Sequence, residues 1–149
     1  MKPLLVIGLG NPLMGDEGIG WHVAERLSGD PRLPAEVEVV CGGTDLLRHA
    51  GRMEQRRRVI VVDALRDDAE PGSVCALEAP AGLDNRQDNV HCLSAIQAIQ
   101  LLRMTVPVPI TLLGISVPCA CVQSDLSPEL AARMPAILDR VLRELDVEY

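Results

Sequence analysis

A glycine-rich segment near the N-terminus constrains the fold more than any other part of the chain. Residues 4–9 form a short apolar run, and five glycines follow within residues 8–20, which also hold the acidic pair Asp16 and Glu17. The apolar run predicts a buried strand that ends in a Gly-Asn-Pro turn. Residues 18–27 then carry apolar side chains at helical spacing. A strand, a tight turn and a helix are typical of the opening of an α/β domain.

Strand-like and helical segments alternate along the rest of the chain. We expect further strands at residues 36–41, 59–63, 72–78 and 109–117, a loop at 79–90, and helices at 44–54, 91–104 and 127–146. The segment 59–63 is apolar on both faces, as central parallel strands are. Ser127 and Pro128 are suited to begin the last helix. This alternation predicts a single α/β domain over residues 1–149, built as a three-layer α/β/α sandwich with a largely parallel sheet.

Composition excludes several classes of function. The 149 residues include 14 basic and 21 acidic side chains, a net charge of −7, and only 1% are aromatic. Nucleic-acid binding needs positive charge or aromatic stacking surfaces, so no nucleic-acid partner is expected. No segment approaches the roughly 20 apolar residues of a membrane helix. The first apolar run is too short for a signal peptide, and we expect a cytoplasmic protein without membrane contact.

Three consecutive arginines and five cysteines have mainly structural interpretations. The run Arg56-Arg57-Arg58 precedes an apolar strand, where we expect it to be solvated, with a partner-binding patch as the alternative. The cysteines contain no CxxC pair, so free thiols in a reducing compartment are expected. Cys119 and Cys121 are interpreted as loop thiols, with a two-thiol metal site as the alternative.

The glycine-rich segment does not match the known nucleotide-binding patterns. The dinucleotide fingerprint requires a glycine where Leu13 stands and an acid where Cys41 stands at the end of the second strand. A P-loop and a Gly-x-Ser-x-Gly elbow are absent from the sequence. Gly18 and Gly20 weaken the first helical turn, which indicates that the backbone there serves a close approach.

Candidate site residues follow the predicted strands. Ligands of open α/β sheets bind beyond the carboxyl ends of the strands. Asp16 and Glu17 follow the first strand, Asp63 ends the third, and His91 begins a helix. The acidic pair could instead cap the first helix, Asp63 could bond a turn, and His91 could be a surface or capping residue. An acid that ends a buried strand needs a reason, and two carboxylates with an imidazole suit a divalent transition metal.

Residues 8–20 closely resemble the opening of the hydrogenase maturation endopeptidases. The later motifs of that family match, in order and spacing, at Gly42-Gly43-Thr44, Val59-Ile60-Val61-Val62-Asp63-Ala64, His91, and Leu112-Leu113-Gly114-Ile115 with Pro118. The resemblance implies a five-stranded mixed sheet with one antiparallel strand, in a phosphorylase/hydrolase-like sandwich. Cys41 departs from the pattern, because the family commonly has an acid immediately before Gly-Gly-Thr.

The resemblance also implies an activity and a site. It implies a peptidase that removes a C-terminal peptide from the nickel-loaded precursor of a nickel–iron hydrogenase large subunit. The metal-contacting Glu, Asp and His of the family fall on Glu17, Asp63 and His91, and Asp16 is a candidate base. We expect the nickel to arrive with the precursor, no organic cofactor, and a monomeric enzyme. Whether the metal is only recognised or also activates water stays open, as does the choice between an aspartic and a metal-dependent peptidase.

Two other functions remain as alternatives. Residues 8–12 also resemble the start of peptidyl-tRNA hydrolases, with His22 about where their catalytic histidine would lie, but the negative charge is unfavourable for tRNA. The second alternative is a non-catalytic chaperone that binds a nickel-bearing partner. Cys41 is a less favoured nucleophile because no nearby histidine can be assigned to it, and His22 and His49 are expected to lie on the surface or to pack between helices.

Overall fold

The computed structural model describes residues 1–77, 90–118 and 125–147, with the backbone alone for residues 90–94. In chain order the elements are β1 (Leu4–Leu9), the 3-10 helix η1 (Gly15–Gly18), α1 (Ile19–Ser28), β2 (Val37–Gly43), the 3-10 helix η2 (Leu47–His49), α2 (Ala50–Met53), β3 (Arg58–Leu65), β4 (Val74–Leu77), α3 (Val90–Arg103), β5 (Ile110–Ser116) and α4 (Pro128–Leu145). The predicted loop before α3, together with Cys119 and Cys121, lies outside the described residues.

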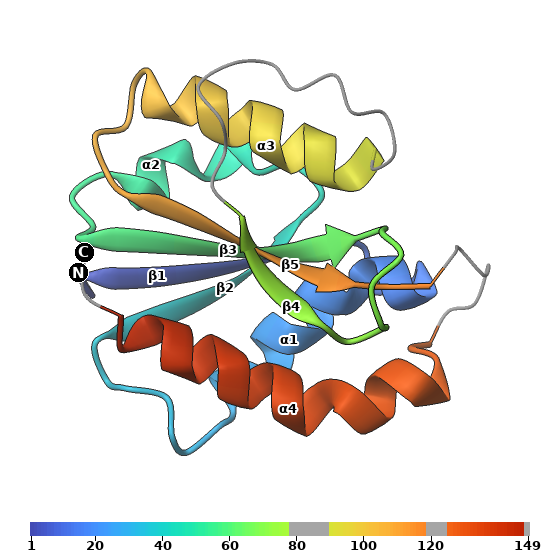
Figure 1. Cartoon of the computed structure of the whole chain (residues 1–149). Helices are drawn as coiled ribbons and strands as arrows, with labels where there is room; N and C mark the ends of the chain where they lie inside the picture. The colour runs from blue at the N-terminus through green and yellow to red at the C-terminus, as the bar shows by residue number, and fades with distance from the viewer. Residues whose placement is uncertain (78–89, 119–124, 148–149) are drawn as a thin grey trace.

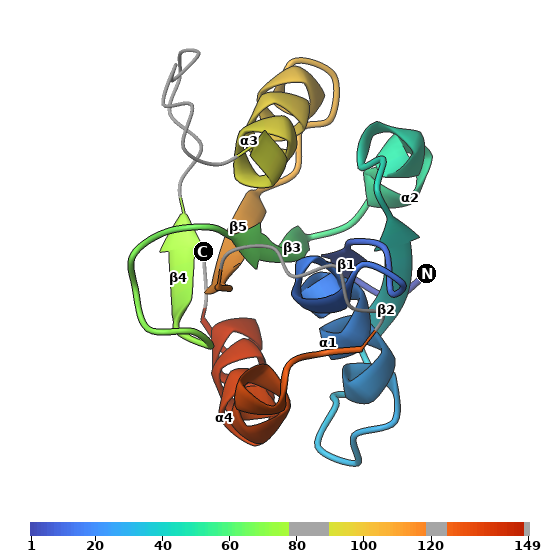
Figure 2. The same ribbon diagram turned by 90° about the vertical axis from the view of Figure 1, so that its right-hand side faces the viewer.

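The five strands form one mixed sheet in the order β2-β1-β3-β5-β4. The pairs β1–β2, β1–β3 and β3–β5 are parallel, and β4 runs antiparallel to β5 at the edge of the sheet. Helices α2 and α3 cover one face, and α1 and α4 cover the other (Figures 1 and 2). The predicted three-layer α/β/α sandwich, with a mostly parallel five-stranded sheet and one antiparallel strand, is therefore confirmed. Because β2 and β3 flank β1 on opposite sides, the topological switch point lies between β1 and β3.

Side chains alternate along the strands and build one apolar layer on each face of the sheet. In β1, Leu4 and Val6 pack with α1 and α4, whereas Leu5 and Ile7 pack with α2 and α3. Both clusters consist of Leu, Ile, Val, Ala and Met side chains. Each large aliphatic side chain that is fully buried contributes about 1.5–3 kcal/mol, so the core needs no aromatic residues.

Glycines bring α1 into direct contact with the sheet. A Cβ on Gly20 would lie 2.2 Å from the carbonyl oxygen of Leu9 and 2.4 Å from that of Val62. A Cβ on Gly8 would lie 2.0 Å from the carbonyl oxygen of Gly20. The close approach predicted for this backbone is confirmed, and it takes place between the first turn of α1 and strands β1 and β3.

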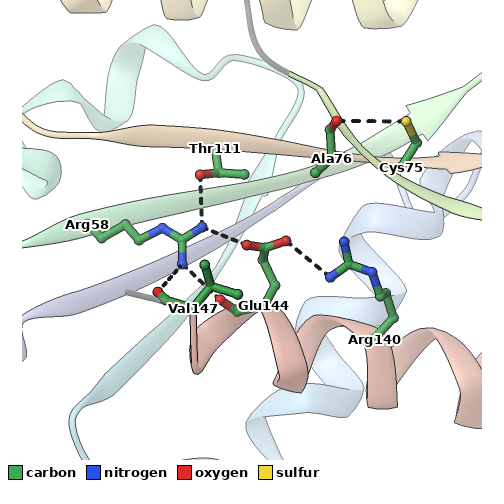
Figure 3. Close-up of polar contacts among 7 residues, drawn as sticks. All are labelled: Arg58, Cys75, Ala76, Thr111, Arg140, Glu144 and Val147. Atoms are coloured by element: carbon green, nitrogen blue, oxygen red, sulfur yellow. Dashed lines mark hydrogen bonds and ion pairs between the residues drawn. The ribbon is translucent and has the colours of Figure 1, made fainter. Parts of the chain in front are cut away.

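The arginine run differs from the prediction of a solvated strand entrance. Arg56 and Arg58 are buried, and Arg58 is only 4% exposed. Arg58 donates to the Glu144 carboxylate at 2.8 Å, to the Glu144 carbonyl at 2.8 Å and to the Val147 carbonyl at 3.2 Å (Figure 3). The solvated interpretation is wrong for these two side chains: strand alternation turns Arg58 toward α4, where Glu144 supplies the opposite charge, and Arg56 pairs with Glu38.

Local helix signals were accurate for α4 and less accurate before β3. The Ser127 hydroxyl caps α4 by accepting from the Leu130 N–H at 3.3 Å, and Pro128 begins the helix. The single helix predicted at residues 44–54 is replaced by two short pieces, η2 and α2. Among the helices of the described ranges, none combines the length and the apolar character required to cross a bilayer.

Candidate active site

A cavity of about 210 Å³ opens at the carboxyl ends of β1 and β3, at the switch point of the sheet. Its lining comes from β1 and β3 near their carboxyl ends, from the segment after β2 that leads into η2, and from one side of α3: Leu9, Gly10, Thr44, Asp45, Leu46, Leu47, Asp63, Ala95, Gln97, Ala98 and Leu101. The location agrees with the edge at which the sequence predicts the candidate residues to converge.

Asp63 is a buried acid within this lining. It belongs to β3, which continues two residues beyond it to Leu65, and it is 6% exposed. Its neighbours on the same face of the strand, Val61 and Leu65, are core residues of the α3 side. Within the described part of the chain its carboxyl group accepts one hydrogen bond, from the Ala64 N–H at 2.8 Å. Burial raises the pKa of Asp63 to about 7, although that hydrogen bond acts in the opposite direction.

The raised pKa gives Asp63 two chemical possibilities. Near neutral pH the carboxyl group can take up or release a proton, which is the property of a general acid or base. The burial of Asp63 also favours the binding of a cation, because a positive charge would compensate for the lost hydration of the carboxylate. A strongly perturbed acid inside a cavity is characteristic of a functional site.

Glu17 reaches the same edge of the sheet from the opposite helical layer. It lies in η1, which packs beside β3, and its side chain is 12% exposed. A Cβ on Gly10, whose φ is +133°, would lie 2.8 Å from the Glu17 carbonyl oxygen, so only glycine allows this approach. The Glu17 carboxylate forms an ion pair with Arg66, the residue directly after β3. Arg66 is not among the candidate residues predicted above, and its position just beyond the strand that carries Asp63 is the signal that could have identified it.

Asp16 contacts a distant part of the chain. Its Oδ1 accepts a hydrogen bond of 2.7 Å from the Ser127 N–H, at the N-cap of α4. The residue at the N-cap of α1 is Gly18, which has no side chain to cap the helix. The alternative in which Asp16 and Glu17 cap α1 is therefore wrong: Asp16 holds the start of α4, and Glu17 holds Arg66. A role for Asp16 as a base stays a prediction.

For His91, the third residue of the predicted set, the structure describes only the backbone. It lies in the first turn of α3, and its side chain is outside the described residues. The described ranges contain no group of three His, Cys, Asp or Glu side chains arranged to hold a metal ion. The structure thus brings Asp63 and the element that carries Glu17 to one edge, and the contribution of His91 stays a prediction.

The other candidate side chains have packing roles. Cys41 is an exposed residue of β2, and its Sγ lies 3.9 Å from the Trp21 carbonyl oxygen. Partial desolvation and the nearby Glu25 raise the pKa of its thiol, which disfavours an activated nucleophile. The His22 ring packs edge-on to Trp21, with ring centroids 5.4 Å apart. His49 Nε2 lies 2.9 Å from the Gly42 carbonyl oxygen of β2, and both histidines are half-buried.

Comparisons with known proteins agree with this architecture. The family model described as hydrogenase maturation protease matches residues 21–144. The chain is 32% identical over 148 residues to the hydrogenase 2 maturation protease of Escherichia coli (strain K12), covering 95% of this chain and 90% of that protein. It is 29% identical over 153 residues to the hydrogenase expression/formation protein HupD of Rhodobacter capsulatus, covering 95% and 70%.

Solved structures of hydrogenase maturation proteases are also similar to this chain. The hydrogenase maturating endopeptidase HybD from E. coli is similar with a TM-score of 0.77 at 31% identity, over 97% of this chain and 94% of that one. The hydrogenase maturation protease HycI from Thermococcus kodakarensis KOD1 has a TM-score of 0.79 at 20% identity, over 98% and 94%, which supports the fold. These similarities favour a peptidase over the peptidyl-tRNA hydrolase and the non-catalytic chaperone. Because the family model, the sequence identity and the fold all agree, the chain belongs to the hydrogenase maturation protease family, a family of peptidases.

Proposed function

We propose that this protein removes a C-terminal peptide from the precursor of a nickel–iron hydrogenase large subunit after nickel has been inserted. The observation that carries the proposal is Asp63, a buried acid with a pKa of about 7 in the cavity at the switch point. Burying an ionised carboxylate without a counter-charge is unfavourable. A cation that arrives with the substrate supplies that charge at the moment of recognition.

The metal of the substrate is proposed to contact Glu17, Asp63 and His91. Carboxylate oxygens and an imidazole nitrogen are donors that divalent transition metals accept. Such a set binds free nickel weakly, so stable binding requires the ligands that the precursor itself provides. Recognition shared between both proteins gives specificity for the loaded precursor. Nickel held there can mark the finished precursor, polarise the scissile carbonyl or activate water.

The walls of the cavity suit a peptide segment. Leu47 and Leu101 line it and are nevertheless 43% and 54% exposed. Exposed leucines around a buried acid give the mixture of apolar lining and a few polar groups that is typical of ligand pockets. We place the C-terminal segment of the precursor against these two side chains, so that its bond to be cut lies near Asp63.

The setting of the reaction is also part of the proposal. We assign a monomeric enzyme in the cytoplasm that binds the precursor and no nucleic acid or membrane. Cys41 and Cys75 are free thiols, which fits a reducing compartment. The net charge of −7 is unfavourable for binding nucleic acid.

The test is a cleavage assay with precursor prepared with and without nickel. The wild-type enzyme should convert the loaded precursor to the shorter mature form on a gel and leave the nickel-free precursor intact. Asp63→Asn should slow conversion by about a thousandfold or more because it removes a group that acts on the reacting centre. Asp139→Asn, the same change at an exposed acid of α4, is the matched control and should cleave normally.

Glu17→Gln and His91→Gln extend the test to the other two proposed contacts. Each changes a donor atom and little volume, so thermal melting should show a folded protein while processing is lost. Equal cleavage of the two precursors would refute recognition of nickel. Normal processing by one of the three variants would remove that residue from the site.

A further inference from the structure

The Glu17–Arg66 ion pair lies where the proposed function requires a metal contact. The Glu17 side chain is 12% exposed and the Arg66 side chain 34% exposed, and the guanidinium contacts the carboxylate directly. A carboxylate that is largely removed from water is costly to leave without a counter-charge. Arg66 therefore supplies the counter-charge of Glu17 while no substrate is bound.

The ion pair between Arg66 and Glu17 also disfavours the binding of a metal ion to Glu17. The Arg66 guanidinium is paired with Oε1 of the Glu17 carboxylate, so it occupies an oxygen that a cation would need. It also carries a positive charge, which repels any cation close to the carboxylate. Arg66 has a third of its side chain in solvent, so it can withdraw from Glu17 without first unfolding the core.

We propose that Arg66 is a placeholder at the Glu17 carboxylate, which it occupies in the unloaded enzyme and releases only to a divalent cation presented by the substrate. The inference rests on the proposed function, because it takes Glu17 as a metal contact. A free cation must displace Arg66 unaided, whereas a cation held in the precursor is accompanied by the peptide contacts of that precursor. The ion pair thereby makes the enzyme select against free metal and in favour of the loaded substrate.

The first experiment is calorimetric titration of the full chain with Ni²⁺ alone. Arg66→Gln removes the competing charge and should bind Ni²⁺ about tenfold more tightly than wild type, or about 1.4 kcal/mol. Arg66→Lys keeps the charge and should stay within about threefold of wild type. Arg32→Gln is the matched control, because it deletes an arginine from an exposed pair with Asp139, and neither residue lines the cavity; its affinity should equal that of wild type.

A double-mutant cycle shows whether the gain comes from Glu17. In the Glu17→Gln background, Arg66→Gln should no longer tighten Ni²⁺ binding, because the carboxylate that it liberates is absent. A thermal melt accompanies each variant. If Arg66→Gln does not fold, Arg66→Met keeps the apolar stem and takes its place. Unchanged or weaker affinity in Arg66→Gln, an equal gain without Glu17, or no measurable binding by any variant would each overturn the placeholder.

Cleavage assays separate failure of the placeholder from failure of the proposed function. If wild type cleaves nickel-free and loaded precursor equally, the proposed function fails, and the titrations still decide whether Arg66 excludes free cations from Glu17. If wild type is selective and the titrations show no gain, the placeholder alone fails. With both correct, free Ni²⁺ should inhibit cleavage by Arg66→Gln at about tenfold lower concentration than it inhibits wild type.

Discussion

Arg58 and Asp63 are buried charged residues of the same strand, β3, and they differ in their partners: Arg58 begins the strand, and Asp63 lies two residues before its carboxyl end. Arg58 is 4% exposed and Asp63 is 6% exposed. Arg58 donates to the Glu144 carboxylate, to two carbonyl oxygens of the C-terminal part of the chain and to the Thr111 hydroxyl at 3.0 Å. Asp63 accepts one hydrogen bond, from its neighbour Ala64, in the described part of the chain. A buried charge that is paired with an opposite charge is a structural element, whereas one that lacks a counter-charge is poised to meet a ligand.

The pKa values of Glu144, the partner of Arg58, and of Asp63 show the same contrast. Burial opposes ionisation of Glu144, but hydrogen bonds from Arg58 and Arg140 outweigh burial and hold its pKa below the ordinary value of 4.5 (Figure 3). Burial of Asp63 is not offset in this way, and its pKa rises to about 7. Glu144 therefore contributes stability that is lost on acidification, while Asp63 lowers stability as the pH rises toward 7.

The largest effect is expected at the amino end of β3. Arg58→Met should lower the free energy of unfolding by about 3–5 kcal/mol, because it leaves Glu144 buried with only part of its charge compensated. Urea denaturation measures this loss. Arg32→Met, the same change in an exposed pair, should cost less than about 1 kcal/mol. The double variant Arg58→Met with Glu144→Leu should recover part of the loss, and an Arg58→Met loss below that of Arg32→Met would contradict a structural role for the pair.

A substitution of Asp63, near the carboxyl end of β3, is expected to raise the free energy of unfolding rather than lower it. Between pH 3.8 and about 7 the unfolded chain releases the Asp63 proton and the folded chain keeps it, so stability falls across that window and levels off above it. Asp63→Asn lacks this penalty and should be more stable than wild type at pH 8, by up to about 4 kcal/mol. The advantage should grow by about 2 kcal/mol between pH 5.5 and pH 8 in urea denaturation. Asp139→Asn should show no such growth, and a pH-independent advantage for Asp63→Asn would show that Asp63 ionises normally.

A smaller effect is expected where Asp16 holds the start of α4. Asp16→Ala should lower the free energy of unfolding by about 2 kcal/mol, because the partly buried Ser127 N–H loses a charged acceptor. Asp16→Asn keeps an acceptor oxygen and should cost less than about 1 kcal/mol. Processing by Asp16→Asn, measured on the same preparation, tests the base: a base loses activity in this variant, whereas a residue that only positions α4 keeps it.

The smallest effect is expected at the rim of the cavity. Leu101→Asp should raise the KM for precursor by about tenfold, because it replaces an apolar contact with a charge, while stability stays within about 0.5 kcal/mol. Met104→Asp is the matched control, since Met104 is exposed near the end of the same helix but does not line the cavity. Equal KM values for the two variants would remove Leu101 from the binding surface.

Much of the fold and part of the site follow from local sequence signals. The apolar run of β1, the cap and proline of α4, and the glycines of the α1 contact each act within a few residues, so their consequences can be predicted. The strand ends also place Asp63 and Glu17 at one edge, because parallel strands share their carboxyl ends. The helix predicted at residues 44–54 is only partly confirmed: residues 47–53 are helical, as a 3-10 turn followed by a short α-helix, and Gly51 weakens the local helical preference of this segment.

By itself the sequence determined the order of strands and helices, the layer architecture and the set of acids near the switch point, because hydrophobic periodicity and turn residues act over short distances. Only the tertiary structure decided which charges meet: Arg58 with Glu144, Glu17 with Arg66, and Asp16 with the start of α4. These partners are far apart along the chain, and their contact depends on how whole elements pack. The same packing left Asp63 without a counter-charge among the described residues, and that difference separates the site from the scaffold.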